Sequence, residues 1–142
     1  MHLLHRAVQC ADEIFQRGAP EDVTPRQLAV LLAVAEKEGA NQTSLVEATS
    51  IDRSTLADIV RRLVKRELLQ RRRTRKDTRS YAVKLTDEGR QVLQTLAPFG
   101  KGVDQRILGV LPASSRKQFI ASLRTIVDSL KGPELGSKQP QA

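Results

Sequence analysis

The sequence contains few of the residues on which several common kinds of site depend. Aromatic residues make up 3% of the 142 residues and tryptophan is absent, so aromatic platforms that stack on bases are not expected. The single cysteine excludes a disulfide within the chain, and one cysteine with two histidines is too few for a zinc site built from these residues alone. The longest apolar run, residues 28–35, is too short to cross a bilayer.

Signals for export and for catalysis are also missing. The N-terminal segment lacks the basic start, long apolar stretch and cleavage site of a signal peptide, so we expect a soluble cytoplasmic protein without a membrane partner. The sequence has no glycine-rich phosphate loop, no Gly-x-Ser-x-Gly elbow and no cluster of metal-ligating residues. These gaps argue against an enzyme and against a bound cofactor or metal.

The charge of the chain is concentrated in one segment. Lys and Arg number 24 against 16 Asp and Glu, which gives a formal net charge of +8. Residues 61–84 contain eleven basic and two acidic side chains, so this segment carries +9 and the rest of the chain is close to neutral. A basic patch on a near-neutral body favours a polyanionic partner such as nucleic acid over an ordinary solvated surface.

Apolar residues at helical spacing, together with capping residues, predict six helices. Thr24, Asp52 and Thr86 are placed to cap the second, fourth and fifth of them, and Pro25 suits a first helical position. The predicted helices occupy residues 3–17, residues 25–38, a short segment from 42 or 43, residues 53–67, a long segment from 87, and a last segment from 112.

Between the fourth and fifth helices the period changes to that of β-strands. Residues 69–73 and 80–85 predict the two strands of a hairpin, which must pack on the helices to be stable. Pro98 and the glycines that follow it predict a kink or break in the fifth helix. Residues 132–142, rich in Gly, Pro, Ser and Gln, are expected to form a disordered tail.

The predicted helix over residues 53–67 has two distinct faces. Its apolar stripe consists of Leu56, Ile59, Val60 and Leu63. The opposite face carries Ser54, Asp58, Arg61 and Lys65, flanked by Thr55 and Arg62. Small polar and basic side chains on an exposed helix suit reading of the DNA major groove, and the alternative is an ordinary solvated helix face.

Three short helices followed by a basic hairpin are the parts of a winged helix-turn-helix. The sequence resembles the multiple antibiotic resistance regulators, the MarR family. The resemblance covers residues 3–130 and rests on four motifs, which are Leu85-Thr86-x-x-Gly89, Asp77-x-Arg79, Thr24-Pro25-Arg26-Gln27 and Asp52-Arg53-Ser54-Thr55-Leu56.

The resemblance implies a mainly α fold with a small β-hairpin wing, flanked by N- and C-terminal dimerisation helices. The implied parts are a dimerisation helix in residues 1–20, a DNA-binding domain in residues 21–90, dimerisation helices in residues 91–131 and the tail. It also implies a homodimer that binds a palindromic double-stranded operator as a transcriptional regulator, usually a repressor. Independently of the resemblance, the apolar terminal helices cannot all pack on the small winged core, and a second copy would bury them.

The candidate DNA-binding residues come from the helix-turn-helix and from the wing. In the family the wing Arg enters the minor groove and the wing Asp holds the loop, so the resemblance gives these roles to Arg79 and Asp77; the alternative is a surface ion pair. The full set is Thr43, Arg53, Ser54, Thr55, Asp58, Arg61, Arg62, Lys65, Arg75, Lys76, Asp77 and Arg79.

The resemblance further implies a small aromatic or phenolic effector that binds between the dimer region and the winged domain. Polar residues of the first helix are candidates to contact it, although solvated helix positions are an equal alternative for each. They are His5, Arg6, Gln9 and Glu13.

Two alternatives to an effector-controlled regulator remain. Some members of the family sense oxidants through a first-helix cysteine, so Cys10 could be redox-active, although we expect it to be a small buried hydrophobic residue. A non-specific architectural DNA-binding protein would share the basic patch. The outward Ser, Thr and Asp of the fourth helix favour specific reading instead.

Overall fold

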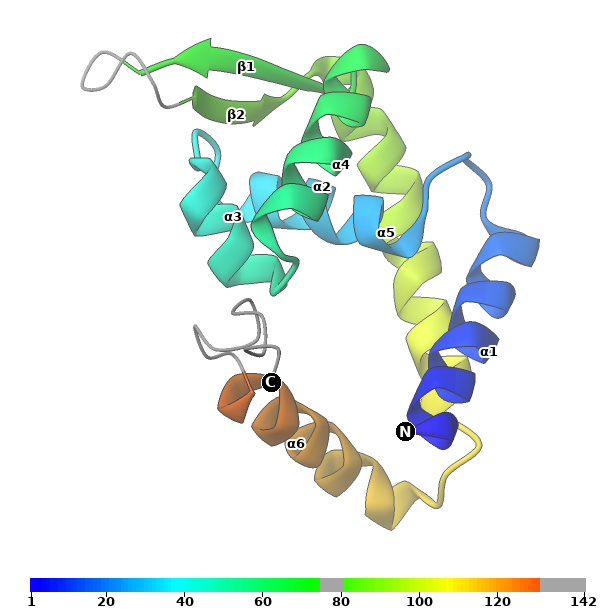
Figure 1. Ribbon diagram of the computed structural model, residues 1–142. Helices are drawn as coiled ribbons and strands as arrows, with labels where there is room; N and C mark the ends of the chain where they lie inside the picture. Colours follow the sequence, from blue (N-terminus) through cyan, green and yellow to red (C-terminus); the bar gives the residue numbers. More distant parts are fainter. Residues whose placement is uncertain (75–80, 131–142) are drawn as a thin grey trace. The chain divides into compact units, whose positions relative to one another are not determined.

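The computed structural model describes residues 1–74 and 81–130. Within these residues six helices and one antiparallel hairpin follow one another (Figure 1), which confirms the predicted mainly α fold with a small hairpin. The elements are α1 (His2–Gly18), α2 (Pro25–Glu36), α3 (Gln42–Thr49), α4 (Arg53–Lys65), β1 (Leu69–Arg73), β2 (Tyr81–Leu85), α5 (Asp87–Leu108) and α6 (Ala113–Ser129). The chain divides into two compact units, residues 1–107 and the residues from 108 onward.

Local capping contacts explain where the helices of the first unit begin. At α2 the Gln27 amide donates to Thr24 Oγ1 at 3.2 Å, and the Thr24 amide donates in return to Gln27 Oε1 at 3.0 Å. This reciprocal pair is a capping box, and Pro25 at the first helical position needs no hydrogen-bond acceptor. At α4 the Thr55 amide donates to Asp52 Oδ1 at 2.9 Å. Both predicted caps are confirmed.

The core of the first unit is formed by α2, α3, α4, the hairpin and α5, and α1 contributes Phe15 to it. The apolar stripe predicted for the fourth helix is confirmed, because all four of its side chains are buried. The largest side chains with almost no exposed surface are Leu31, Leu45, Leu56, Leu63, Leu69, Leu96, Val30 and Val34. Burying the apolar face of α4 leaves its polar face at the surface.

The hairpin is joined to the helices through β2. Leu69 pairs with Leu85 at one end of the hairpin and Arg73 pairs with Tyr81 at the other. The Val83 amide donates to the Ala40 carbonyl oxygen at 3.0 Å, so the segment after α2 extends the pairing by one bridge. Val83 and Leu85 are buried as their alternation predicts, whereas Tyr81, at the end of the hairpin, is 41% exposed.

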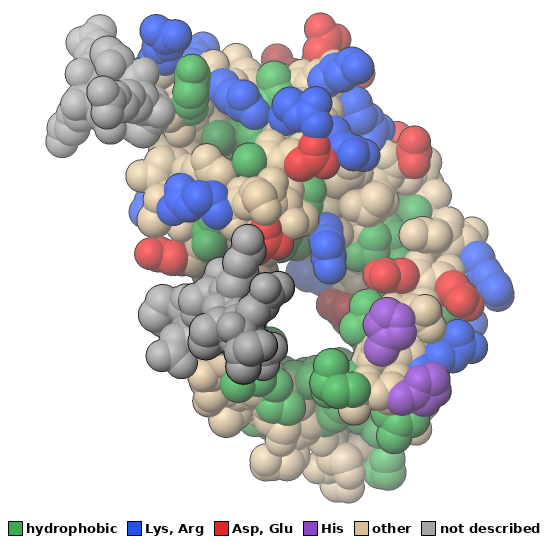
Figure 2. Space-filling view, viewed as in Figure 1, with side chains coloured by type: hydrophobic (Ala, Val, Ile, Leu, Met, Phe, Trp, Pro, Cys, Tyr) green, Lys and Arg blue, Asp and Glu red, His purple; other side chains and the backbone are tan. Residues whose placement is uncertain are grey.

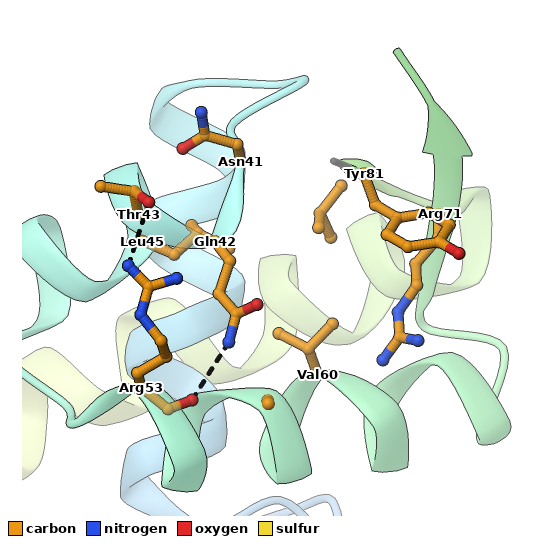
Figure 3. A pocket seen from close by; sticks show the side chains of 10 residues that line it. Asn41, Gln42, Thr43, Leu45, Arg53, Val60, Arg71 and Tyr81 are labelled. Atoms are coloured by element: carbon orange, nitrogen blue, oxygen red, sulfur yellow. Dashed lines mark hydrogen bonds between the residues drawn. The ribbon is translucent and has the colours of Figure 1, made fainter. Parts of the chain in front are cut away.

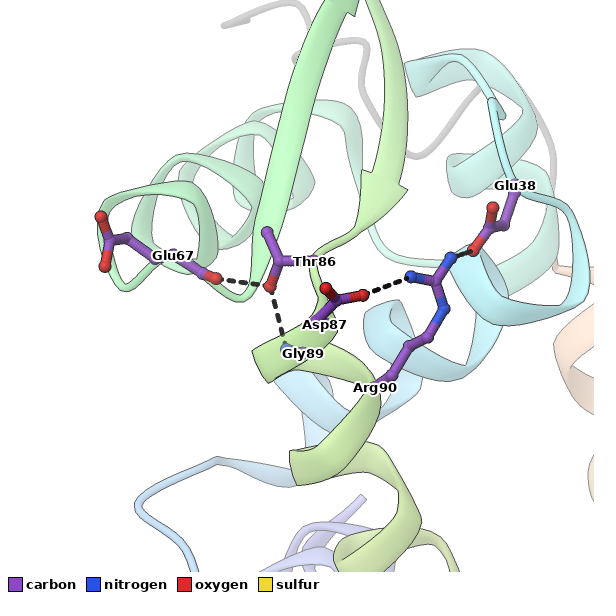
Figure 4. Close-up of polar contacts among 6 residues, drawn as sticks. All are labelled: Glu38, Glu67, Thr86, Asp87, Gly89 and Arg90. Carbon is purple, nitrogen blue, oxygen red and sulfur yellow. Dashed lines mark hydrogen bonds and ion pairs between the residues drawn. The ribbon is translucent and has the colours of Figure 1, made fainter.

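The beginning of α5 is bound to the residues that connect α4 to β1 (Figure 4). Thr86 Oγ1 accepts from the Gly89 amide at 2.9 Å, which confirms the predicted cap, and its hydroxyl donates to the Glu67 carbonyl oxygen at 2.5 Å. Arg90 forms ion pairs with Glu38, after α2, and with Asp87. The first turn of α5 is therefore attached to two separate parts of the first unit.

The structure corrects two expectations about helix ends and continuity. α2 and α4 each end two residues earlier than predicted, and the backbone takes positive φ angles shortly afterwards, at Gly39 and Glu67. The predicted break in the fifth helix is wrong, because α5 continues through Pro98. Pro98 is exposed, so solvent can bond the Gln94 carbonyl group that loses its helical partner there. The kink remains a prediction.

The second unit contains α6, which begins at Ala113, one residue after the predicted start, with Pro112 in the capping position. Arg116 Nε donates to the carbonyl oxygens of Leu108 and Leu111 at 3.1 and 3.2 Å and so stabilises the turn that precedes the helix. α6 has no buried side chain, and its exposed apolar side chains include Phe119, Leu123, Ile126, Val127 and Leu130. The predicted tail lies outside the described residues. None of the helices described has the length and apolar character needed to cross a membrane.

Candidate nucleic-acid interface

The polar face of α4 is at the surface, as predicted. Basic side chains gather at the end of the first unit that carries α4 and the hairpin (Figure 2). Thr55 and Asp58 are half-buried, and the exposed candidates on this helix are Arg53, Ser54, Arg61, Arg62 and Lys65. α4 therefore has a buried apolar stripe on one side and a basic, polar face open to solvent on the other.

Asp58 lies between two arginine side chains on this face. Arg62 Nε is 2.8 Å from Asp58 Oδ2, and Arg61 pairs with Asp58 Oδ1. The hydrogen bond from Arg61 and the positive charge of Arg62 lower the pKa of the Asp58 carboxyl group below its usual value. Asp58 is therefore an ionised acceptor that serves two guanidinium groups.

The N-terminus of α4 is fixed by its capping residue. The Ser54 hydroxyl donates to Asp52 Oδ1 at 2.8 Å, the oxygen that also accepts from the Thr55 amide. Hydrogen bonds from Thr55 and Ser54 lower the pKa of Asp52 to about 2. The hydroxyl proton of Ser54 is directed at this cap, which leaves the Ser54 oxygen as an acceptor for another group.

A pocket of about 350 Å³ lies between α3, α4 and the hairpin (Figure 3). Arg53 donates to Thr43 Oγ1 at 3.2 Å, so these two predicted residues are in contact, and Gln42 Nε2 donates to the Arg53 carbonyl oxygen at 3.1 Å. These bonds hold the first turn of α3 against the first turn of α4. The pocket is lined by Asn41, Gln42, Thr43, Leu45, Arg53, Ala57, Val60, Arg71, Tyr81 and Val83.

Several residues of this pocket were not among the sequence candidates. The Arg71 guanidinium carbon lies 6.0 Å from the centre of the Tyr81 ring, at the outer limit of a cation–π contact. Arg71 belongs to the basic segment, and the predicted hairpin was the signal that could have placed it near Tyr81. The sequence pattern did not indicate Gln42, because its contact with Arg53 depends on the angle between two helices.

The tip of the wing lies outside the described residues. Four candidates fall there, which are Arg75, Lys76, Asp77 and Arg79. The described part of the wing supports a basic surface, since Arg71, Arg72 and Arg73 on β1 are all exposed.

The polar candidates of α1 are exposed and contact one another. Arg6 donates to Gln9 Oε1 at 3.4 Å, Gln9 Nε2 is 3.3 Å from His5 Nε2, and Glu13 is 3.8 Å from Arg17. Cys10 is exposed, so the expectation that it is a buried hydrophobic residue is wrong. Cys10 lies at the edge of the apolar stripe, on the solvent-exposed side of the helix.

A second pocket, of about 360 Å³, lies between α1, α2 and α5. Its walls are mainly apolar, and the charged residues Asp12, Lys101 and Asp104 also line it. Phe15 forms part of the wall and makes an edge-to-face contact with Phe99, with ring centroids 5.2 Å apart. The pocket is lined by Ala11, Asp12, Phe15, Pro25, Leu28, Ala29, Leu32, Ala97, Gly100, Lys101, Val103, Asp104 and Ile107, a set that contains none of the four polar α1 candidates.

Three helices, a basic hairpin and an exposed, capped fourth-helix face define a winged helix-turn-helix protein. Residues 21–80 match the model of the MarR family. The transcriptional regulator HosA of Escherichia coli O157:H7 is 34% identical over 128 residues, which cover 90% of this chain and 94% of HosA. The chain belongs to the MarR family of transcriptional regulators.

Two solved structures of regulators share the fold. PcaV from Streptomyces coelicolor, in complex with its natural ligand, is 32% identical with a TM-score of 0.86, over 92% of each chain. BpsR from Bordetella bronchiseptica, whose DNA binding is regulated by 6-hydroxynicotinic acid, is 32% identical with a TM-score of 0.79. That match covers 88% of this chain and 96% of BpsR.

Proposed function

We propose that this MarR-family regulator binds a palindromic double-stranded operator as a homodimer, represses transcription, and is released by a small aromatic or phenolic effector. The observation that carries the proposal is α4, whose apolar stripe is buried while its polar and basic face is exposed. A role on DNA supports the cytoplasmic location expected from the sequence.

In this proposal α4 lies in the major groove. Arg61, Arg62 and Lys65 supply donors for guanine or phosphate, and Ser54, Thr55 and Asp58 supply short polar groups near the start of the helix. Thr43 and Arg53, which contact each other, face the DNA backbone. The wing residues Arg75, Lys76 and Arg79 approach the minor groove, with Asp77 bracing the loop.

The homodimer is supported by apolar side chains that the chain itself does not cover. On α1 these include Leu3, 82% exposed, and Val8, 58% exposed. α6 adds a series of exposed apolar side chains at helical spacing. In the proposed organisation, residues 1–20 and residues 91–131 form the dimer region and residues 21–90 bind DNA.

The effector is proposed to bind in the pocket between α1, α2 and α5. Its volume falls within the range of small-molecule sites, and its mainly apolar wall suits an aromatic ring. Lys101 offers a positive charge to an acidic substituent. The DNA binding of BpsR is regulated by 6-hydroxynicotinic acid, and PcaV has been solved in complex with its natural ligand, which supports control by a ligand here as well. His5, Arg6, Gln9 and Glu13 remain an alternative contact set on α1.

Competition between two duplexes tests the proposed function. The full chain is titrated with a duplex from the region upstream of its own gene and with a random duplex of equal length, at several salt concentrations. We expect binding of the upstream duplex to be tighter by at least about a hundredfold, with the dimer as the bound species. Equal affinities would favour the non-specific architectural alternative.

The redox alternative gains support from one observation, the exposure of Cys10. Treatment of the protein–DNA complex with peroxide, for the natural chain and for Cys10→Ser, separates the two kinds of control. We expect both proteins to stay bound, and to be released alike by the effector. Release of the natural chain alone by peroxide would establish redox sensing instead.

A further inference from the structure

The polar face of α4 carries one acidic side chain, Asp58, one helical turn before Arg61 and Arg62, the first residues of the basic segment. A negative charge on a surface that approaches phosphates weakens binding unless it has another role. The two ion pairs of Asp58 supply such a role. One carboxylate contacts Arg61 and Arg62, which lie one helical turn further along the same face.

The geometry of the Arg62 pair leaves the guanidinium group able to bind a second partner. Asp58 Oδ2 pairs with Arg62 Nε, at 2.8 Å, so the edge formed by the two terminal nitrogens keeps its donors. Two donors on one edge match the O6 and N7 acceptors of guanine in the major groove. The Arg62 side chain is 64% exposed, so this edge is accessible.

Resting on the proposed function, we infer that Asp58 is a positioning residue that fixes Arg62 to read a guanine in each half of the operator. An unrestrained arginine would reach the nearest phosphate as readily as a base, and a phosphate contact carries no sequence information. The ion pair with Asp58 restricts the guanidinium group and offsets one positive charge of the pair. Asp58 thus lowers the affinity for non-specific DNA and raises the selectivity for the operator sequence.

This inference predicts opposite effects on two kinds of DNA. Asp58→Asn removes a negative charge, so binding to random duplex should stay the same or become tighter. Selectivity should fall, because Arg62 loses the partner that orients it. A role limited to folding would weaken binding to both kinds of DNA together.

The experiment begins with selection of duplexes by the full-length natural chain. The library is randomised over about 20 base pairs, enough for two half-sites one helical turn apart. Each base pair of the enriched half-site is then replaced symmetrically, and the Kd of each duplex is measured at one salt concentration. The proteins are the natural chain, Asp58→Asn, Arg62→Ala and Glu47→Gln. Glu47, exposed on α3, is the matched control for the loss of one negative charge.

We expect one G·C pair whose replacement weakens DNA binding by roughly tenfold or more, both for the natural chain and for Glu47→Gln. This is within the range for a good bidentate contact. The same replacement should change binding of Asp58→Asn and of Arg62→Ala by less than about threefold. If either variant keeps the natural profile, or if the two lose selectivity at different base pairs, the inference is overturned while the proposed function stands. A natural chain that enriches no sequence would overturn the proposed function, and this inference with it.

Discussion

Gly89 lies directly against the main chain of Leu68. A Cβ atom on Gly89 would be 2.0 Å from the Leu68 carbonyl oxygen and 3.0 Å from the carbonyl carbon, closer than non-bonded atoms approach. The Leu68 carbonyl oxygen also accepts from the Thr86 amide at 3.1 Å, so the main chain cannot easily move away. This close contact gives the glycine of the Leu85-Thr86-x-x-Gly89 motif its physical reason.

Gly89→Ala should therefore reduce the free energy of unfolding by about 3 kcal/mol, the upper end of the range for an overpacked position. Gly102→Ala, in the same helix, is the matched control. Gly102 is exposed and a Cβ there would meet no atom within 4 Å, so alanine should stabilise the protein by up to about 1 kcal/mol. Urea unfolding followed by circular dichroism measures both, and an equal effect of the two substitutions would contradict the close-contact account.

Asp52 predicts a loss of stability in acid. Its pKa is lowered from 3.8 to about 2 in the folded protein, so its ionised form stabilises the fold at pH values above about 4. This contribution is lost progressively as the pH falls from about 4 towards 2. Asp52→Asn keeps a capping side chain without the titration. The Tm of the natural chain should fall more steeply than that of the variant in this range, and parallel curves would contradict the prediction.

The exposed apolar face of α6 predicts that a charge placed on it weakens the proposed dimer. Ile126 is 46% exposed on this face, and Ile126→Asp should raise the concentration at which the dimer dissociates by at least about tenfold, since a charge there is costly to bury. Thr125→Asp is the matched control on the opposite face, where the exposed Thr125 donates through Oγ1 to the Ala121 carbonyl oxygen of its own helix. Light scattering across a dilution series measures the dissociation. A variant that remains dimeric and binds its operator would contradict the proposed dimer region.

The proposed contact of Arg79 with the minor groove predicts that its loss weakens operator binding. Arg79→Ala should weaken operator binding by roughly 1–3 kcal/mol, the range for a good groove contact, without changing the Tm. Arg124→Ala, on exposed α6, removes the same charge elsewhere and should change binding little. Titrations on the upstream duplex measure both variants. Equal losses would mean that Arg79 acts only through the net charge of the protein.

The features that the sequence predicts are those determined by neighbouring residues. Thr24, Asp52 and Thr86 cap helices through contacts within three residues, and the stripe of α4 follows from helical spacing. Contacts between distant segments carry no such signal. Arg90 and Glu38 are 52 residues apart, and Phe15 meets Phe99 only because α1 and α5 pack together.

Exposure is also difficult to predict at the edge of an amphipathic helix. Cys10 borders the apolar stripe of α1, and a small rotation of the helix decides whether it is covered. The break expected at Pro98 does not occur, for a related reason. A helix with an exposed proline can continue when the core residues on either side, Leu96 and Val103, are buried.

The lack of buried side chains in α6 has a consequence for the folding equilibrium. Most of the stability of a helix comes from packing of its apolar face, so in the proposed dimer the second copy would supply contacts that stabilise α6. With the second copy in that role, mass action governs the folding of α6, and its unfolding temperature rises with protein concentration. The abundance of the protein then determines how much of each chain is folded as well as how many operators are occupied.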